Sequence, residues 1–253
     1  MDKKRKLGQR KKSEYRVFIA TPAYDGKVHT DYAVSLADSC MHATSVGISV
    51  TASVMSNGAF IEMARNIFIA EFLQTDCTHL FYIDSDLKWE SRAFVGLVTA
   101  GRPVCAGVYP KRQKPEEYPV HYIEDKDNPG ISVVDGGWVG CDRVPTGFLC
   151  IERHVVEKMA KDAEKLYIRE KEYLIPWVFS TRIVDDAHGH RAFCGEDFAW
   201  SDDYKKMFDK PIFVWPDFDF SHDGFDGNWH KFMMRQIEAA EGTDNPIDLV
   251  VGE

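Results

Sequence analysis

The sequence predicts an α/β fold in which a mixed, mainly parallel sheet is flanked by helices. From residue 16 to about residue 109, short apolar runs rich in β-branched residues alternate with segments whose apolar residues recur at helical intervals. This alternation favours parallel strand pairs joined by right-handed crossovers. The chain has 253 residues, 44% of them hydrophobic, and no internal repeat or linker divides it. We therefore expect one domain at residues 15–253 behind a basic, disordered segment at residues 1–14.

The first half of the chain contains the clearest elements. Residues 16–21 (RVFIAT) predict a strand that ends at Pro22, and the helix that follows should be capped by Thr30 or Asp31 and end before Gly47. The further expected elements are a strand at residues 46–54, a helix at 60–73, a strand at 79–83, a helix at 90–100 and a strand at 104–109.

The second half is less regular. Pro and Gly recur between residues 110 and 145 around short extended pieces, which indicates hairpins or a loop-rich insert. The segment VPTGFLCIE then leads into a charged helix at about residues 153–166. Another helix begins at residue 196, IFVWP predicts a last strand, and a helix should begin near residue 229.

Two carboxylates, Asp84 and Asp86, stand at the end of the third expected strand. Their spacing alone decides nothing, because it recurs within residues 125–127 and 217–219. Their context differs, since the run LFYI before Asp84 is typical of a buried parallel strand. Open α/β sheets bind their ligands beyond the carboxyl ends of such strands. The pair is therefore the first candidate for a functional site.

Three more polar residues could join this site. Glu196 and Asp197 open an expected helix, and His222 lies in a polar turn after the last strand. Strand-end carboxylates suit a hard cation such as Mn²⁺ or Mg²⁺, which keeps positions for water and phosphate oxygens, and Mn²⁺ also accepts an imidazole nitrogen. Such a cation would neutralise a leaving diphosphate while the protein orients an acceptor and removes its proton.

Composition excludes several other classes. The six cysteines form no Cys-x-x-Cys pair and lie mostly in apolar surroundings, which favours buried thiols over zinc or disulfides. No apolar stretch is long enough for a membrane span, and the basic N-terminus has no apolar segment behind it, so we expect a cytoplasmic protein, in the host cytoplasm if it is viral.

Charge is distributed unevenly. Residues 1–12 carry a net charge of +6 and the remainder carries −15. An acidic body binds nucleic acid poorly, whereas the basic segment can reach phosphates or an anionic membrane, or can simply be a solvated extension.

With these motifs in place, the chain resembles the metal-dependent glycosyltransferases of the GT-A fold, in particular short single-domain members found in phages and large viruses. The resemblance covers most of residues 16–224 and rests on FIATPAYDG, EMARNIFIAEFL, FYIDSD, PTGFLCIER, GEDFAW and SHDG, in that order. It implies a nucleotide-sugar half at about residues 15–109, an acceptor half at about 110–230, and a C-terminal helix and tail at about 229–253.

The resemblance also implies roles for the matching residues. Asp197 would be the base of an inverting reaction, with Glu196 holding the acceptor or sharing that task, and Asp86 and His222 would bind the metal. The residues expected at the UDP-sugar donor are Thr21, Pro22, Ala23, Arg65, Asp84 and Ser85. The residues expected on the acceptor side are Trp138, Thr146 and Gly147, of which Trp138 could stack on a sugar or a base.

Simpler interpretations remain for several of these residues. Arg65 and its neighbour Asn66 could face solvent, the pair at residues 196–197 could merely complement a helix dipole, and His222 could be a surface turn residue. The tryptophans could be core residues. A nucleotidyltransferase acting on sugar phosphates also uses strand-end carboxylates with Mg²⁺, a glycoside hydrolase would need a carboxylate pair without metal, and a decayed sugar- or nucleic-acid-binding module is a further alternative.

The acceptor is left open by the sequence, because the short C-terminus and the unusual insert depart from the family pattern. The donor would supply a hexose, glucose-like by analogy, to a hydroxyl of a glycan or of a hydroxymethylated pyrimidine in DNA. The basic segment and the absence of a membrane span or export signal in the sequence favour the DNA option.

Overall fold

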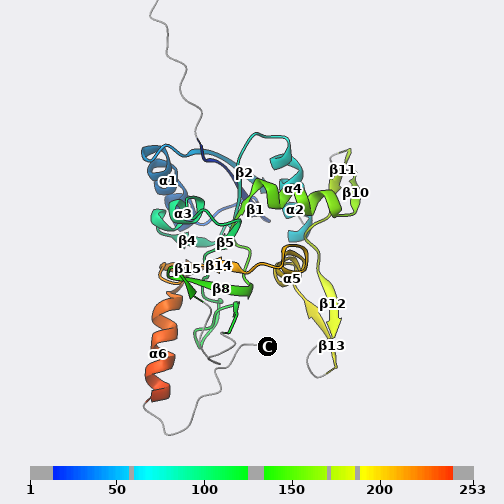
Figure 1. Ribbon diagram of the computed structural model, residues 1–253. Coiled ribbons are helices and arrows are strands. Elements are labelled where there is room, and N and C mark those ends of the chain that lie inside the picture. The colour runs from blue at the N-terminus through cyan, green and yellow to red at the C-terminus, as the bar shows by residue number, and fades with distance from the viewer. Residues whose placement is uncertain (1–13, 57–59, 125–133, 170–171, 186–188, 242–253) are drawn as a thin grey trace, which may run out of the picture.

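The structure, a computed structural model, describes residues 14–56, 60–124, 134–169, 172–185 and 189–241 (Figure 1). The expectations for the basic segment up to residue 13, for the carboxylates within residues 125–127 and for the tail at 242–253 lie outside these residues.

A mixed sheet forms the centre of the molecule. In the described residues it has nine strands in the order β2-β1-β3-β9-β5-β14-β8-β6, with β7 beside β8. The strands are β1 (Arg16–Ala23), β2 (Ser49–Ser56), β3 (His79–Ile83), β5 (Val104–Ala106), β6 (His121–Tyr122), β7 (Val134–Asp135), β8 (Trp138–Arg143), β9 (Phe148–Glu152) and β14 (Ile212–Val214).

The sheet confirms the predicted fold class. Strand β1 pairs in parallel with β2 and with β3, and β14 pairs in parallel with β5. Within this sheet, β8 and β9 run opposite to the other described strands. The position of β9 between β3 and β5 was not predicted, because an antiparallel strand inserted from later in the chain leaves no mark on the alternating pattern of the first half.

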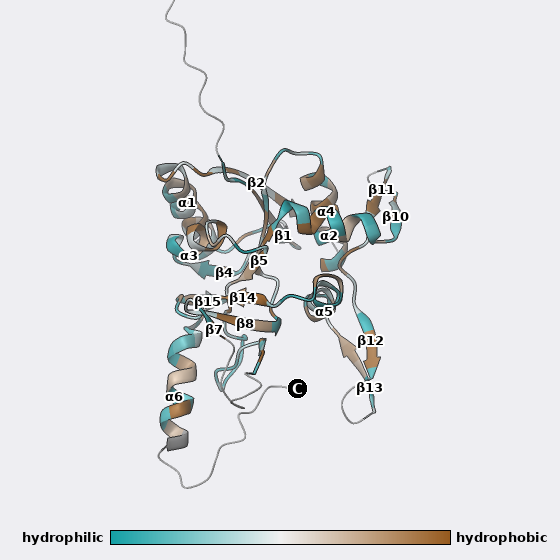
Figure 2. Ribbon diagram, viewed as in Figure 1, coloured by the Kyte–Doolittle hydropathy of each residue, from teal (hydrophilic) through white to brown (hydrophobic). Residues whose placement is uncertain are grey.

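Helices cover both faces of this sheet (Figure 1). Along β1, Val17 and Ile19 face a core shared with α1 and α3, whereas Phe18 and Ala20 face a core shared with α2, α4 and α5. Figure 2 shows the hydrophobic residues of β8 and β14 at the centre. The helices are α1 (Thr30–Ser45), α2 (Ile61–Leu73), α3 (Ser91–Val98), α4 (Arg153–Asp162), α5 (Glu196–Phe208) and α6 (Trp229–Glu241). None of the helices within the described ranges is both long and apolar enough to cross a membrane.

Two helix ends differ from the prediction. His29 is the N-cap of α1 and its side chain makes no capping hydrogen bond, so the expected cap at Thr30 or Asp31 is wrong. The chain enters the helix extended at His29, whose backbone N–H donates to the Ser85 carbonyl at 2.9 Å, and this contact fixes the start. Helix α4 ends at Asp162 instead of continuing to residue 166, because the next residues form a hairpin strand.

Smaller sheets project from the central layer. The segment at residues 110–145 does form a hairpin, with Gly136 and Gly137 at positive φ between β7 and β8, but β8 joins the central sheet and is not a separate insert. The hairpins β10–β11 and β12–β13 have two strands each, and β16-β15-β4 forms a three-stranded sheet. Their strands are β4 (Leu87–Trp89), β10 (Lys165–Ile168), β11 (Tyr173–Pro176), β12 (Arg182–Asp185), β13 (Arg191–Cys194), β15 (Phe220–His222) and β16 (Phe225–Gly227).

Candidate active site

A cavity of about 460 Å³ lies beyond the carboxyl ends of β1 and β3. This is the edge where a sheet with parallel pairs is expected to bind ligands. It is lined by Pro22, Ala23, Tyr24, Met55, Ile61, Ala64, Asp84, Ser85, Asp86 and Arg112. The first strand and the Asp-x-Asp motif together supply six residues that were expected at the donor or the metal. Five of them line this cavity: Pro22, Ala23, Asp84, Ser85 and Asp86.

The sixth residue, Thr21, lies elsewhere. It is fully buried, and its hydroxyl forms a 2.5 Å hydrogen bond with the hydroxyl of Tyr32 on α1. Residues of a strand alternate between its two faces, so Thr21 points toward the α1 layer while Pro22 lines the cavity. Thr21 thus positions the strand end and helix α1 relative to each other.

Arg65 connects the two acidic motifs. Its side chain is 3% exposed, and its guanidinium donates to Oδ1 of Asp84 at 3.2 Å and to Oε1 of Glu196 at 2.5 Å. Its neighbour Asn66 is also buried, and accepts hydrogen bonds from the backbone of Val178 and Phe179. The solvent-facing interpretation of Arg65 and Asn66 is therefore wrong.

The position of Asp84 depends on the turn that precedes β9. The Asp84 backbone N–H donates to the Gly147 carbonyl at 2.9 Å, and the Gly147 N–H donates to the Tyr109 hydroxyl at 3.1 Å. A Cβ at Gly147 would overlap both the Asp84 carboxylate and the Tyr109 hydroxyl, so the turn requires glycine. The adjacent Thr146 is buried, and its hydroxyl has no hydrogen-bond partner among the described residues.

Glu196 and Asp197 begin helix α5 next to Arg65. Burial raises the pKa of both carboxyls; the Arg65 guanidinium opposes this shift at Glu196, and the Phe198 N–H, which donates to Asp197 Oδ1 at 2.8 Å, opposes it at Asp197. Glu196 is held in its ion pair, whereas no ion pair of Asp197 occurs in the part of the chain that the structure describes. The pair thus does more than complement a helix dipole.

Asp86 and His222 meet across neighbouring strands. His222 on β15 is the register partner of Leu87 on β4, which places its Nε2 3.4 Å from Oδ2 of Asp86. The His222 side chain is 15% exposed, so it is not a free surface residue. Its pKa is raised: burial lowers it, but the Asp86 carboxylate and the Pro110 carbonyl raise it more.

This pair fits a divalent cation. His222 Nδ1 lies 2.9 Å from the Pro110 carbonyl, and donation there leaves Nε2 as the ligand nitrogen beside the Asp86 carboxylate. No group of three or more His, Cys, Asp or Glu with metal-binding geometry occurs within the described ranges. A site of two protein ligands leaves most coordination positions to water and phosphate oxygens, as Mg²⁺ and Mn²⁺ tolerate.

The expected acceptor-side tryptophan lies away from the cavity. Trp138 packs edge-on against Trp215 at a centroid distance of 5.5 Å, with the Arg102 guanidinium 5.3 Å from its ring. It does not line the cavity. Sequence reasoning missed two residues that contact the site, Tyr109 and Arg112. The Tyr109 hydroxyl accepts a hydrogen bond from Gly147, and Arg112 pairs with Asp86. Nothing in the local sequence marks either residue, because both contacts are with residues far away in the chain.

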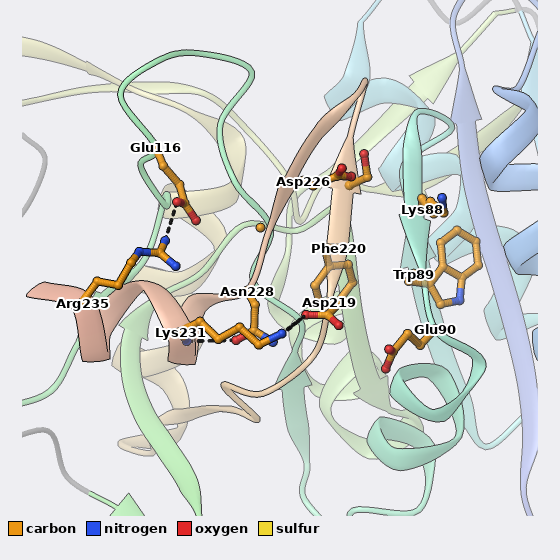
Figure 3. A pocket seen from close by; sticks show the side chains of 12 residues that line it. Lys88, Trp89, Glu90, Glu116, Asp219, Phe220, Asp226, Asn228, Lys231 and Arg235 are labelled. Carbon is orange, nitrogen blue, oxygen red and sulfur yellow. Dashed lines mark hydrogen bonds and ion pairs between the residues drawn. The ribbon is translucent and has the colours of Figure 1, made fainter.

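A second cavity, of about 530 Å³, lies between helix α6 and the outer face of the three-stranded sheet (Figure 3). Lys88 of β4 and Asp226 of β16 are among its lining residues. On its rim the Arg235 guanidinium donates to Glu116 at 2.6 Å, which ties the segment after Pro110 to α6. This segment contributes a residue to each cavity, Arg112 to the first and Glu116 to the second.

No model of a known protein family matches this chain, and no curated protein matches it. Among solved structures, A197 from STIV is similar at 17% identity, with 82% of this chain and 85% of that chain covered and a TM-score of 0.47. GalNAc-T7, solved with UDP, GalNAc and Mn²⁺, is similar at 11% identity over 83% of this chain and 45% of that chain, with a TM-score of 0.43. A putative glucose-1-phosphate thymidylyltransferase from Bacillus anthracis is similar at 10% identity over 94% of this chain and 97% of that chain, with a TM-score of 0.39.

Proposed function

We propose that this protein is a metal-dependent, inverting glycosyltransferase that moves a hexose from a UDP-sugar to a hydroxyl acceptor. One observation carries the proposal: Arg65 joins the strand-end carboxylate Asp84 to the acid pair at the start of α5, beside a cavity that also contains Asp86. The motif that would supply the metal ligand and the acid pair that would supply the base are thereby linked, through Asp84 and Glu196.

The donor would occupy the cavity of about 460 Å³. Pro22 and Ala23 would contact the nucleotide, and Asp84 and Ser85 the ribose or the donor sugar. Asp86 and His222 would hold Mn²⁺ or Mg²⁺, which supplies charge neutralisation at the diphosphate when bound.

Asp197 would remove the acceptor proton. A base is most effective when its pKa approaches the working pH, and burial moves the pKa of Asp197 in that direction. Glu196 is a weaker choice, because its ion pair with Arg65 stabilises the ionised carboxylate and so opposes its taking up a proton. Glu196 would instead hold Arg65 and orient the acceptor together with the buried Thr146 and Gly147.

The proposal leaves two acceptor classes, a glycan and a hydroxymethylated pyrimidine in DNA. Labelled UDP-sugars incubated with Mn²⁺ and each acceptor class test it directly. We expect transfer with release of UDP, loss of transfer in EDTA, and recovery when Mn²⁺ is returned. A nucleotidyltransferase would release pyrophosphate from a nucleoside triphosphate, and activity that survives complete metal removal would contradict the proposal.

A further inference from the structure

Arg112 forms an ion pair with Asp86, the carboxylate that we assign to the metal. One of its terminal nitrogens lies 3.2 Å from Oδ2 of Asp86 and 3.9 Å from Oδ2 of Asp223. The same Asp86 oxygen is the one that faces Nε2 of His222. The guanidinium therefore stands where a divalent cation would bind.

A guanidinium and a divalent cation cannot share this oxygen, because their charges repel at such a short distance. The backbone around Arg112 is well held: the Lys111 N–H donates to the Glu117 carbonyl at 2.8 Å, and Glu116 is fixed by Arg235 (Figure 3). The Arg112 side chain is 54% exposed, so it can leave Asp86 by rotating its own bonds.

A diphosphate bound in the cavity would be a new partner for the Arg112 side chain. Arg112 is the sole Lys or Arg among the described residues that line it, and the other charged lining groups are the carboxylates of Asp84 and Asp86. Arg65 behind them is already bound to two carboxylates. A diphosphate entering the cavity would need a cationic partner besides the metal, and a guanidinium donates to phosphate oxygens in a bidentate manner.

We propose that Arg112 exchanges partners during donor binding, pairing with Asp86 in the free protein and with the donor's diphosphate once a divalent cation binds Asp86. This step rests on the proposed function in taking the ligand to be a nucleoside diphosphate. It predicts that one substitution changes two affinities in opposite directions, which neither a purely structural role nor a simple phosphate contact would do.

The test compares Arg112→Gln with wild type and with Lys114→Gln. Lys114→Gln is a matched control, because it removes the same charge from the same segment. Lys114 does not line the cavity, and its ammonium lies 6.0 Å from the centre of the Phe225 ring. Mn²⁺ alone is titrated by electron paramagnetic resonance, and UDP is titrated by calorimetry in saturating Mn²⁺. Thermal unfolding of each variant checks that it is folded.

For Arg112→Gln we expect Mn²⁺ alone to bind about 2- to 5-fold more tightly, as removal of an exposed competing ion pair allows. UDP should bind about 10- to 100-fold more weakly, because charge-assisted hydrogen bonds to phosphate are lost. Lys114→Gln should change both constants less than about twofold.

The outcomes separate the two ideas. If Arg112→Gln leaves Mn²⁺ binding unchanged or weakens it, the guanidinium does not compete with the metal and the exchange is overturned. If UDP binding is unchanged, the phosphate role is overturned while the proposed function stands. A wild-type protein that binds Mn²⁺ but not UDP overturns the proposed function and this inference together.

Discussion

The substitution Arg65→Met removes the guanidinium and keeps an unbranched apolar stem, and it should be among the most destabilising changes in the described part of the chain. The Arg65 side chain is 3% exposed, and its charge compensates those of Asp84 and Glu196. Removing one partner of a buried ion pair costs about 3 to 5 kcal/mol, because a charge is left without compensation. The side chains of Asp84 and Glu196 are 26% and 17% exposed, so water screens them in part and we expect about 2 to 3 kcal/mol.

Urea unfolding at pH 7 measures this loss as a shift of the midpoint at constant slope. The double variant Arg65→Met/Glu196→Gln should recover about 1 kcal/mol, because one of the two uncompensated carboxylates is gone. At about pH 4 the loss should shrink, because burial raises the pKa of Glu196 and protonation then neutralises a carboxyl that has lost its partner. Lys158→Met, which breaks an exposed pair with Asp162, is the control and should leave the urea midpoint nearly unchanged. A loss below about 1 kcal/mol for Arg65→Met would refute the view that Arg65 holds the two motifs together.

Four further changes probe the rest of the site. Asp86→Ala should abolish Mn²⁺-dependent UDP binding in calorimetry, and unchanged affinity would place the metal elsewhere. Gly147→Ala should cost about 1 to 3 kcal/mol in urea unfolding and weaken UDP binding, because its methyl overlaps the Asp84 carboxylate, so a variant of normal stability would contradict the turn geometry. Asp197→Asn should keep UDP and Mn²⁺ binding while lowering transfer by about 10² to 10⁴, and near-normal turnover would assign the base to another acid. Deleting residues 1–12 should weaken binding to hydroxymethylated DNA and reduce its salt dependence, without changing hydrolysis of the UDP-sugar; equal DNA binding at low salt would remove the charge argument for a DNA acceptor.

Much of the first half of the fold could be predicted from local patterns. Strands β1 and β3 and helix α2 each follow from the spacing of apolar residues, and parallel pairing then places the two strand ends at one edge of the sheet. The sequence therefore predicts the Asp-x-Asp motif at the ligand-binding edge, whereas its grouping with Pro22 and Ala23 is what the family resemblance implies.

The remaining features depend on contacts between distant residues. Arg65 and Glu196 are 131 positions apart, and nothing local to either indicates that they meet. The same holds for Arg112, whose pairing with Asp86 follows from the path of a segment without regular structure, and for β9, which is placed by its antiparallel partners β3 and β5. The burial of Thr21 under Tyr32 likewise depends on where helix α1 packs.

The buried charge of Asp197 lowers the stability of the folded protein at neutral pH, and the pH dependence of this effect can be measured. Burial raises the pKa of Asp197 above its ordinary value, so the folded state binds a proton at this carboxyl more readily than the unfolded state does. Stability from this group is therefore greatest below the unfolded pKa of about 3.8 and is lost as pH rises through the folded pKa. Asn keeps an oxygen that can accept the Phe198 N–H and carries no charge, so Asp197→Asn should stabilise the protein at pH 7 by about 0.5 to 2 kcal/mol, and the gain should vanish near pH 3. Urea unfolding at both pH values measures this, and a variant less stable than wild type at pH 7 would show that the Asp197 charge is compensated. A residue whose neutral replacement strengthens the fold but weakens transfer is one whose charge serves the reaction and not the structure.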